Sequence, residues 1–304
     1  MKQKRRNKNK PHQFDGKYYK IKVDELDKHL IIIQGVNYKD RECFVQYAFE
    51  GDFKSKYHSF SISKLETKDD VVYLENNIFA KNLMHIELPE LHLTANFQNL
   101  DLTKDSEKVS TMGVLKNIPF VQCKHEIISL SRKCDLSINN FNDINLNSKG
   151  EIYIERNWGK SFPKEYLWIH CYDQIDGESF EFQFAVAKPK FLGLRPKVHL
   201  GILNFKNKTY NFGLQRKTKV RLIDYNSLNN TLSFVIDGKD FQIVCSLNQG
   251  FFTEFLSPGK NGMSGKILES LNSNLTLNFA NGINKFQLTS KNVSSELVNI
   301  QGLL

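Results

Sequence analysis

The chain has 304 residues and a formal net charge of +9, a length that suits one large domain or two medium domains. Hydrophobic residues make up 40% of it and aromatic residues 12%, which excludes an intrinsically disordered protein. Six of the basic residues lie within residues 1–10. This clustering predicts a disordered basic tail, with at most a transient contact to a membrane surface and no nucleic-acid partner.

Targeting and metal-binding signals are missing from the sequence. No stretch approaches the ~20 apolar residues of a membrane helix, and no apolar segment follows the basic start as it would in a signal peptide. We therefore expect a cytoplasmic protein. The five cysteines are scattered without a C-x-x-C pair, the eight histidines have no metal-ligand spacing, and no phosphate-binding loop occurs. We expect reduced thiols, no metal and no cofactor.

The first part of the chain, residues 11–140, alternates short apolar runs with Gly, Asn and Asp clusters, which predicts strands joined by turns. A segment rich in Asn and Asp, residues 139–150, then suggests a domain boundary at residues 140/141. The strands expected before it cover residues 18–23, 30–34, 43–49, 58–65, 71–75, 83–88, 91–97, 121–130 and 135–138.

The second part, residues 141–304, continues in the same way. Residues 180, 182 and 184 are all Phe and alternate with polar residues, which predicts one buried strand face. Asp237-Gly238 is a hairpin signal. No segment has a sustained 3.6-residue period, so we predict an all-β protein. Further strands are expected at residues 152–155, 166–172, 179–187, 198–205, 209–214, 219–224, 231–236, 241–245, 262–271, 275–279 and 285–289.

A weak internal repeat indicates two equivalent halves. Residues 127–136 match residues 268–277 at an offset of 141, and Tyr18 falls on Tyr166 at an offset of 148. Many short strands with tight turns favour closed or nearly closed antiparallel barrels, because closure removes exposed strand edges. A barrel of about eight strands can hold one small ligand.

The most informative stretch is residues 151–172, which contains both tryptophans, Trp158 and Trp168. It begins as a strand, is expected to break at residues 157–159 and Pro163, and resumes as a strand with apolar or aromatic residues on both faces. Glu155 and Asn157 thus lie beside bulky rings just before a buried strand. Rings next to an ionisable group are more typical of a pocket wall than of a turn.

The same stretch resembles the signature of the tocopherol cyclase family, in its residues 153–163, YIERNWGKSFP, followed by YLWIHC. Four other segments resemble family motifs in the same order: FDGKYYKIK at 14–22, CFVQY at 43–47, MGVLKNIPFVQCKHEIISL at 112–130 and SPGKNGMSGKILESL at 257–271. The resemblance spans roughly residues 14–277. It implies two tandem lipocalin-like antiparallel β-barrels and a hydrophobic isoprenoid or aromatic-lipid ligand.

The resemblance also implies a reaction, the closure of a chromanol ring by addition of a phenol oxygen across a prenyl double bond. That reaction needs a dry site, an acid kept protonated by burial, and aromatic faces that stabilise a cation. Glu155 is the expected acid, with a pKa raised by burial because Arg156 faces the other way; Asp15 and His125 are the next candidates. The expected ligand-binding residues are Tyr18, Tyr153, Asn157, Trp158, Trp168 and His170.

The sequence departs from the family pattern where Asp15 replaces Glu, Lys17 replaces Trp and Glu126 replaces a small residue. Simpler interpretations also stand: Glu155 as the partner of Arg156 in an ordinary ion pair, Asn157 as a turn cap, and Trp158 as core. The principal alternative function is a non-catalytic lipocalin-like carrier of a hydrophobic small molecule. A third hypothesis is an enzyme-derived scaffold whose pocket is vestigial.

Overall fold

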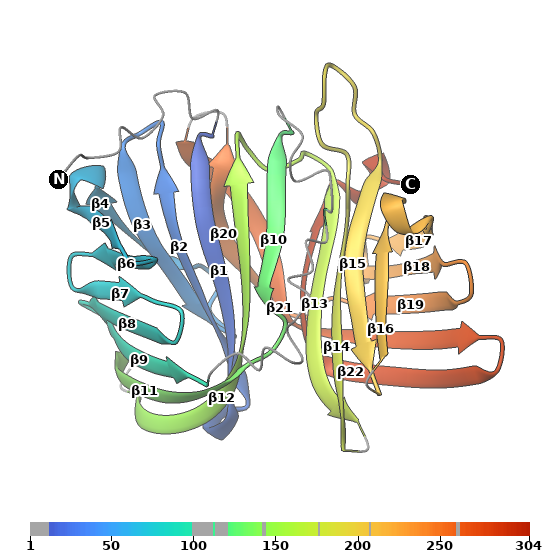
Figure 1. Cartoon of the computed structure of the whole chain (residues 1–304), viewed down its shortest axis with the longest axis horizontal. Coiled ribbons are helices and arrows are strands. Elements are labelled where there is room, and N and C mark those ends of the chain that lie inside the picture. Colours follow the sequence, from blue (N-terminus) through green and yellow to red (C-terminus); the bar gives the residue numbers. More distant parts are fainter. Residues whose placement is uncertain are drawn as a thin grey trace.

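The computed structural model describes residues 12–98, 112, 121–141, 144–175, 177–206, 208–259 and 262–304, which form two antiparallel sheets (Figure 1). The predicted basic tail lies outside these residues, as does the part of the 112–130 motif between Met112 and Val121. Among the described residues the only helices are short 3-10 turns.

The first sheet has 12 strands and runs in the order β4-β3-β2-β1-β12-β11-β9-β8-β7-β6-β5, with β10 paired to β12. Its two end strands, β4 and β5, are joined through a single 3-10 turn, so the sheet curls toward closure. The elements are β1 (Phe14–Val23), η1 (Asp24–Leu26), β2 (Lys28–Asn37), β3 (Glu42–Phe49), β4 (Lys56–Ser61), η2 (Ile62–Lys64), β5 (Leu65–Lys68), β6 (Val71–Leu74), β7 (Asn77–Phe79), β8 (Leu83–Leu88), β9 (Leu91–Phe97), β10 (Cys123–Ser129), β11 (Lys133–Phe141) and β12 (Ile144–Gly159).

The second sheet has ten strands in the order β16-β15-β14-β13-β22-β21-β19-β18-β17, with β20 paired to β21. This order repeats that of the first sheet from β1 and β12 outward, and it confirms the predicted all-β fold of two tandem lipocalin-like barrels. The elements are β13 (Tyr166–Ile175), β14 (Glu178–Ala187), β15 (Val198–Phe205), β16 (Lys208–Gly213), η4 (Leu214–Arg216), β17 (Lys219–Asn226), β18 (Thr231–Asp237), β19 (Gln242–Asn248), β20 (Phe252–Gly259), β21 (Gly262–Asn281), β22 (Asn284–Val298) and η5 (Ile300–Gly302).

The interior of each barrel is filled by its own apolar cluster. Strand alternation sends Tyr19 and Ile21 into the first core, and Phe182 and Phe184 into the second, all nearly fully buried. A third cluster, which includes Tyr18, Tyr153 and Trp168, lies on the opposite faces of the same central strands. The two barrels pack against each other through this third cluster.

The change from the first sheet to the second occurs later in the chain than the predicted boundary at residues 140/141. The Asn-rich segment belongs to the β11–β12 hairpin, and β12 pairs with β1 along residues 150–159. Asn and Asp favour hairpin turns as well as linkers, so their composition did not distinguish the two. The crossing lies between Gly159 and Tyr166, where Pro163 cannot donate to a ladder.

Strand β20, which the sequence analysis did not predict, holds the barrels together. In Figure 1 its label lies among the strands of the first barrel, and the backbone amide of Ser55 donates to the carbonyl of Glu254 (2.9 Å). The side chain of Gln46 on β3 donates to the carbonyl of Leu256 (3.2 Å) and accepts from its amide (3.0 Å), so it mimics a ladder partner. Thr253 Oγ1 also donates to the carbonyl of Asp52 (2.7 Å).

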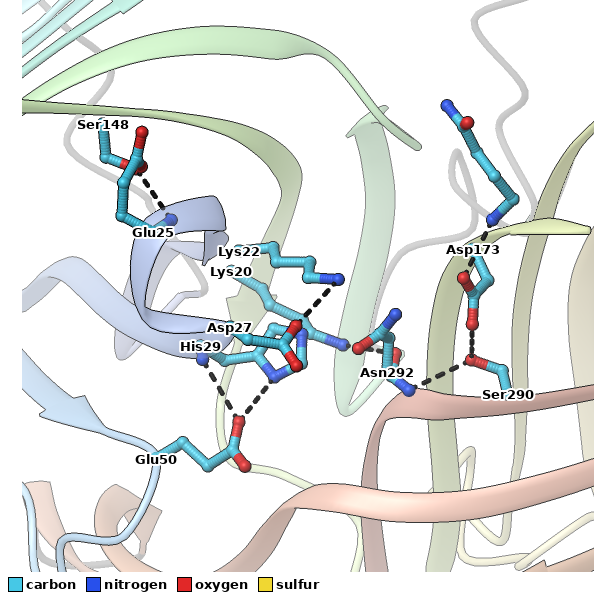
Figure 2. A network of polar contacts seen from close by, with 11 residues as sticks. Lys20, Lys22, Glu25, Asp27, His29, Glu50, Ser148, Asp173, Ser290 and Asn292 are labelled. Carbon is cyan, nitrogen blue, oxygen red and sulfur yellow. Dashed lines mark hydrogen bonds and ion pairs between the residues drawn. The ribbon is translucent and has the colours of Figure 1, made fainter. Parts of the chain in front are cut away.

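A buried lysine makes a second connection between the barrels (Figure 2). Lys20 Nζ on β1 donates to the carbonyl of Asn292 on β22 (3.1 Å), close to the His29–Glu50 pair of the first barrel. Lys20 is 4% exposed, and burial lowers its pKa to about 8. Across the ranges given above, no helix has the length and apolar character needed to cross a membrane.

Candidate functional site

A cavity of about 210 Å³ lies between the two barrels, next to the third apolar cluster. Its volume exceeds the roughly 150 Å³ that is sufficient for a benzene ring. Most of its wall is apolar, and a few polar groups converge on it, as is usual for small-molecule sites. The polar lining residues come from both barrels and are Tyr18, His125, Glu155, Asn157, Tyr166 and Glu296.

Glu155 on β12 is 5% exposed and accepts four hydrogen bonds. Oε2 accepts from the Tyr153 hydroxyl (2.6 Å) and the Trp168 indole (3.1 Å), and it contacts His125 Nε2 (2.9 Å). Oε1 accepts from the amide of Asn157 (2.7 Å). Five of the residues predicted for the site, from β10, β12 and β13, are therefore brought into direct contact.

These contacts reverse the expected acid–base character of Glu155. Burial raises its pKa, but the charge of His125 and the hydrogen bonds from His125, Tyr153 and Asn157 lower it, and the lowering wins. The pKa of Glu155 therefore lies below its usual value, and the predicted rise is wrong. Burial alone would raise the pKa of this carboxyl, whereas hydrogen bonds from several donors stabilise its charged form.

Asp15 and Trp158 lie on the other face of their strands. Arg156 forms a two-pronged pair with Asp15, at 2.8 and 2.6 Å, and its guanidinium lies 4.8 Å from the ring centre of Trp158. Strand alternation puts these three residues on the same side as Ile154, which belongs to the core of the first barrel. Arg156 thus faces away from Glu155, as the alternation predicted. Asp15 is the ion-pair partner of Arg156 and does not line the cavity.

Tyr153 and His170 lie behind the cavity wall. Their rings stack with centroids 3.7 Å apart. His170 is 2% exposed, and burial lowers its pKa well below the usual range. It adjoins a small polar space of about 20 Å³, shared with Lys20 and His29. His170 therefore supports the ring whose hydroxyl bonds to Glu155.

A second pair of acids, which the sequence analysis missed, faces the site from the second barrel. Glu269 on β21 and Glu296 on β22 are directly opposed neighbours in the antiparallel ladder. The hydroxyl of Tyr18 donates to Glu269 (2.5 Å), and that of Tyr166 donates to Glu296. Opposed like charges are unfavourable in such a ladder, so this pair tends to retain a proton.

The pKa values of both acids reflect this environment. Burial raises the pKa of Glu296 to about 7, with a further contribution from the charge of Glu155. Burial, followed by the charge of Glu296, raises the pKa of Glu269 well above its usual value. The cavity is thus lined by Glu155, whose pKa lies below its usual value, and by Glu296, whose pKa is about 7.

A sequence signal for Glu296 was present. It lies 141 residues after Glu155, which is the offset of the internal repeat, and Tyr18 and Tyr166 are likewise related by the offset of 148. Glu269 falls within the quoted segment at residues 257–271. The repeat applied residue by residue would have pointed to Glu296.

A second lobe of about 70 Å³ adjoins the cavity on the side of β20 and β21. Its wall includes Glu269 and apolar residues of both barrels, such as Phe44 and Phe255. The residues that line both lobes are Tyr18, Glu155, Asn157, Phe162 and Glu296. The ionisable groups therefore lie where the two lobes meet.

The described side chains that line the cavity do not form a metal-binding group. Within the part of the chain that the structure describes, no three His, Cys, Asp or Glu side chains are grouped so that they could hold a metal ion. The polar groups of the cavity bond to one another instead.

Comparison with known proteins supports the fold. No family model matches the chain, and no curated protein matches it by sequence. Among solved structures, an ATTH-type protein from Nitrosomonas europaea matches with a TM-score of 0.53 and 12% identity, over 93% of this chain and 92% of that one. CghA, solved with Sch210972, matches with a TM-score of 0.56 and 9% identity, over 95% and 89%. At these identities the likeness shows a shared lipocalin-like fold alone.

Proposed function

We propose that this protein is a tocopherol cyclase-like enzyme, which closes a ring by acid-catalysed addition across a double bond of a hydrophobic isoprenoid ligand. The observation that carries the proposal is the divergence of pKa values at one apolar cavity, with Glu155 below its usual value and Glu296 at about 7. Acidic groups whose environments push their pKa values apart are typical of an acid and a charge stabiliser.

In this mechanism the acid is Glu296 rather than Glu155. The protonated carboxyl of Glu296 transfers its proton to the less substituted alkene carbon, which leaves a tertiary cation on the other carbon. The Glu155 carboxylate and the rings of Tyr18 and Trp168, which border the same cavity, stabilise that cation. The phenol oxygen of the ligand then forms the new carbon–oxygen bond, and its proton returns to Glu296. Reactant and product are isomers, so no electrons are exchanged.

The apolar wall supports this chemistry because water would quench the cation. The larger lobe suits a ring-sized apolar group, and the smaller lobe adds room beside Glu269. The resemblance at residues 153–163 favours a prenylated phenol. That CghA was solved with Sch210972 agrees with ligand binding by proteins of this fold. A water in place of the phenol would give a hydration-type addition.

A panel of prenylated quinols, assayed for binding and for cyclised product, tests the proposal. Glu296→Gln should bind about as well as the wild type and lose turnover by roughly a hundredfold or more, the usual scale for a general acid. Wild-type activity should fall as the pH rises through about 7, because Glu296 then loses its proton. Glu178→Gln, at an exposed position on β14, is the matched control and should keep full activity.

One outcome would contradict the enzyme, and another would assign its acid to a different residue. Tight binding without product by the wild type would favour the non-catalytic carrier. Turnover that survives in Glu296→Gln but not in Glu269→Gln would assign the proton to the other member of the pair.

A further inference from the structure

The connection between β14 and β15, residues 188–197, forms a projecting hairpin beside the cavity. Figure 1 shows it extending beyond the neighbouring strand ends at the top of the view. Phe191 and Leu194 exchange backbone hydrogen bonds of 3.0 and 2.9 Å, so the tip is a two-residue turn of Leu192 and Gly193. Leu192 is 75% exposed and Leu194 is 69% exposed.

The backbone conformation at position 192 does not explain why the residue there is a leucine. Its φ is 47° and that of Gly193 is 83°, so both tip residues are in the left-handed region. Asn, Asp and Gly are the usual residues in such a turn, and a bulky side chain there is an outlier. A leucine that is disfavoured by the backbone and also exposed to water contributes little to folding. Such an outlier indicates a function at that position.

The base of the same hairpin forms part of the cavity wall. Pro189, Phe191 and Pro196 line the larger lobe. Gln122 fastens the base in place, because its Oε1 accepts from the Lys190 amide (2.7 Å) and its Nε2 donates to the Phe162 carbonyl (2.8 Å). The exposed leucines are thus carried by a segment whose inner side chains would touch a bound ligand.

The hairpin that carries the leucines, and the adjoining segment after β12, are rich in basic residues. Glu165 is the acid next to them, and it pairs with Arg195. The ammonium groups of Lys188 and Lys197 donate to the carbonyls of Gly302 and Leu303, which are neutral acceptors. The basic side chains of the hairpin and of the adjoining segment after β12 are Lys160, Lys164, Lys188, Lys190, Arg195 and Lys197. Exposed apolar groups on a segment rich in basic residues are typical of segments that bind anionic lipid surfaces.

We propose that this hairpin docks on an anionic lipid bilayer, with Leu192 and Leu194 inserted between the headgroups and the basic side chains of the hairpin facing the anionic lipids. The cavity wall then lies at the bilayer surface, where an apolar ligand is dissolved. The docking goes beyond the proposed function, since it depends on the hairpin and not on the acids. A ligand can thereby pass between bilayer and cavity without crossing water.

Vesicle binding by the full-length chain tests the proposal. The probes are vesicles of phosphatidylcholine with phosphatidylglycerol, and the double variant Leu192→Asn/Leu194→Ser should bind them at least about tenfold more weakly, since each buried leucine stabilises insertion. Leu192→Asn should leave the melting temperature unchanged or raise it, because Asn suits the left-handed turn. Leu228→Asn and Ile283→Asn, at exposed tips of the β17–β18 and β21–β22 turns, are matched controls and should bind as the wild type does.

Other results would overturn it. If the double variant binds vesicles as tightly as the wild type, or if wild-type binding vanishes entirely when salt screens the basic tail, the leucines do not insert. A concentration-dependent dimer that the double variant abolishes would identify a second copy of the chain as the occupant. Turnover of a detergent-dispersed quinol, which bypasses the bilayer, should be unchanged in the double variant, so failure of docking is separable from failure of the proposed enzyme.

Discussion

Glu155 and Glu296 are separated by the repeat offset of 141 residues and line one cavity from the two halves of the chain, yet their environments drive their pKa values in opposite directions. Each is on the last long strand of its half, and each faces the same cavity. His125 lowers the pKa of Glu155 most, and the neighbours of each glutamate on its own strand add to the difference. Tyr153 and Asn157 donate to Glu155, whereas Ser294 and Val298 stand two residues to either side of Glu296.

Two barrels with similar strand orders thus form an asymmetric site. In the first barrel, donors gather round the carboxyl and stabilise its charge. In the second, Glu296 has the Tyr166 hydroxyl as a donor and the carboxyl of Glu269 opposite it. In the proposed mechanism, Glu155 is the charge stabiliser and Glu296 is the proton donor.

The largest expected effect is on stability. Glu155→Leu removes the acceptor of three buried donors, those of Tyr153, Asn157 and Trp168, so it should lower the free energy of unfolding by about 3–5 kcal/mol. Glu296→Leu at pH 8 removes a carboxyl that faces another, so it should change stability by about 1 kcal/mol or less. Urea denaturation measures both; equal losses would mean that the two glutamates are not in different environments.

The next effect is a pH dependence of folding. Between the unfolded pKa near 4.5 and the folded pKa near 7, native Glu296 binds a proton that the unfolded chain has released. Stability should therefore fall as the pH rises through this window, by about 2 kcal/mol, allowing for the part of Glu296 that faces the cavity. Denaturation at pH 5 and pH 8 measures it. The slope should diminish in Glu296→Gln, and a wild-type stability that rises over the same range would contradict the assignment.

A substitution at the repeat position tests the reason for the asymmetry. Val298→Asn places near Glu296 the amide that Asn157 provides for Glu155. A new hydrogen bond to the charged form should lower the pKa of Glu296 by about one unit. The midpoint of its carboxyl titration, followed by infrared or NMR spectroscopy, gives the shift. Val298→Leu, which offers no donor, should not lower the midpoint.

The smallest effect is expected from removing the hydroxyl of Tyr166, which donates a hydrogen bond to Glu296. Tyr166→Phe deletes a hydrogen bond that lowers the pKa of Glu296, so the titration midpoint should rise, by about half a unit to one unit. Tyr18→Phe removes the bond to Glu269 instead and should move the midpoint of Glu296 less. A fall of the midpoint in Tyr166→Phe would show that the hydroxyl stabilises the protonated form.

The local pattern of the sequence alone predicted much of this protein's fold and part of its candidate site. The alternation around Phe182 and Phe184 and the many turn signals predicted an all-β chain, the repeat predicted two similar halves, and residues 151–172 pointed to Glu155 and its aromatic neighbours. These features follow from the two-residue period of a strand and from turn chemistry, both of which depend on residues that are close together in the sequence.

Tertiary structure decided the rest. The hydrogen bond between Tyr18 and Glu269 joins residues 251 positions apart, and the opposition of Glu269 to Glu296 depends on strand register. The direction of the Glu155 pKa depends on His125, which arrives from another strand. The cavity lies between the barrels because their interiors are filled. Register, burial and the partners of a charge are set by contacts between distant segments, so the period of a single strand does not contain them.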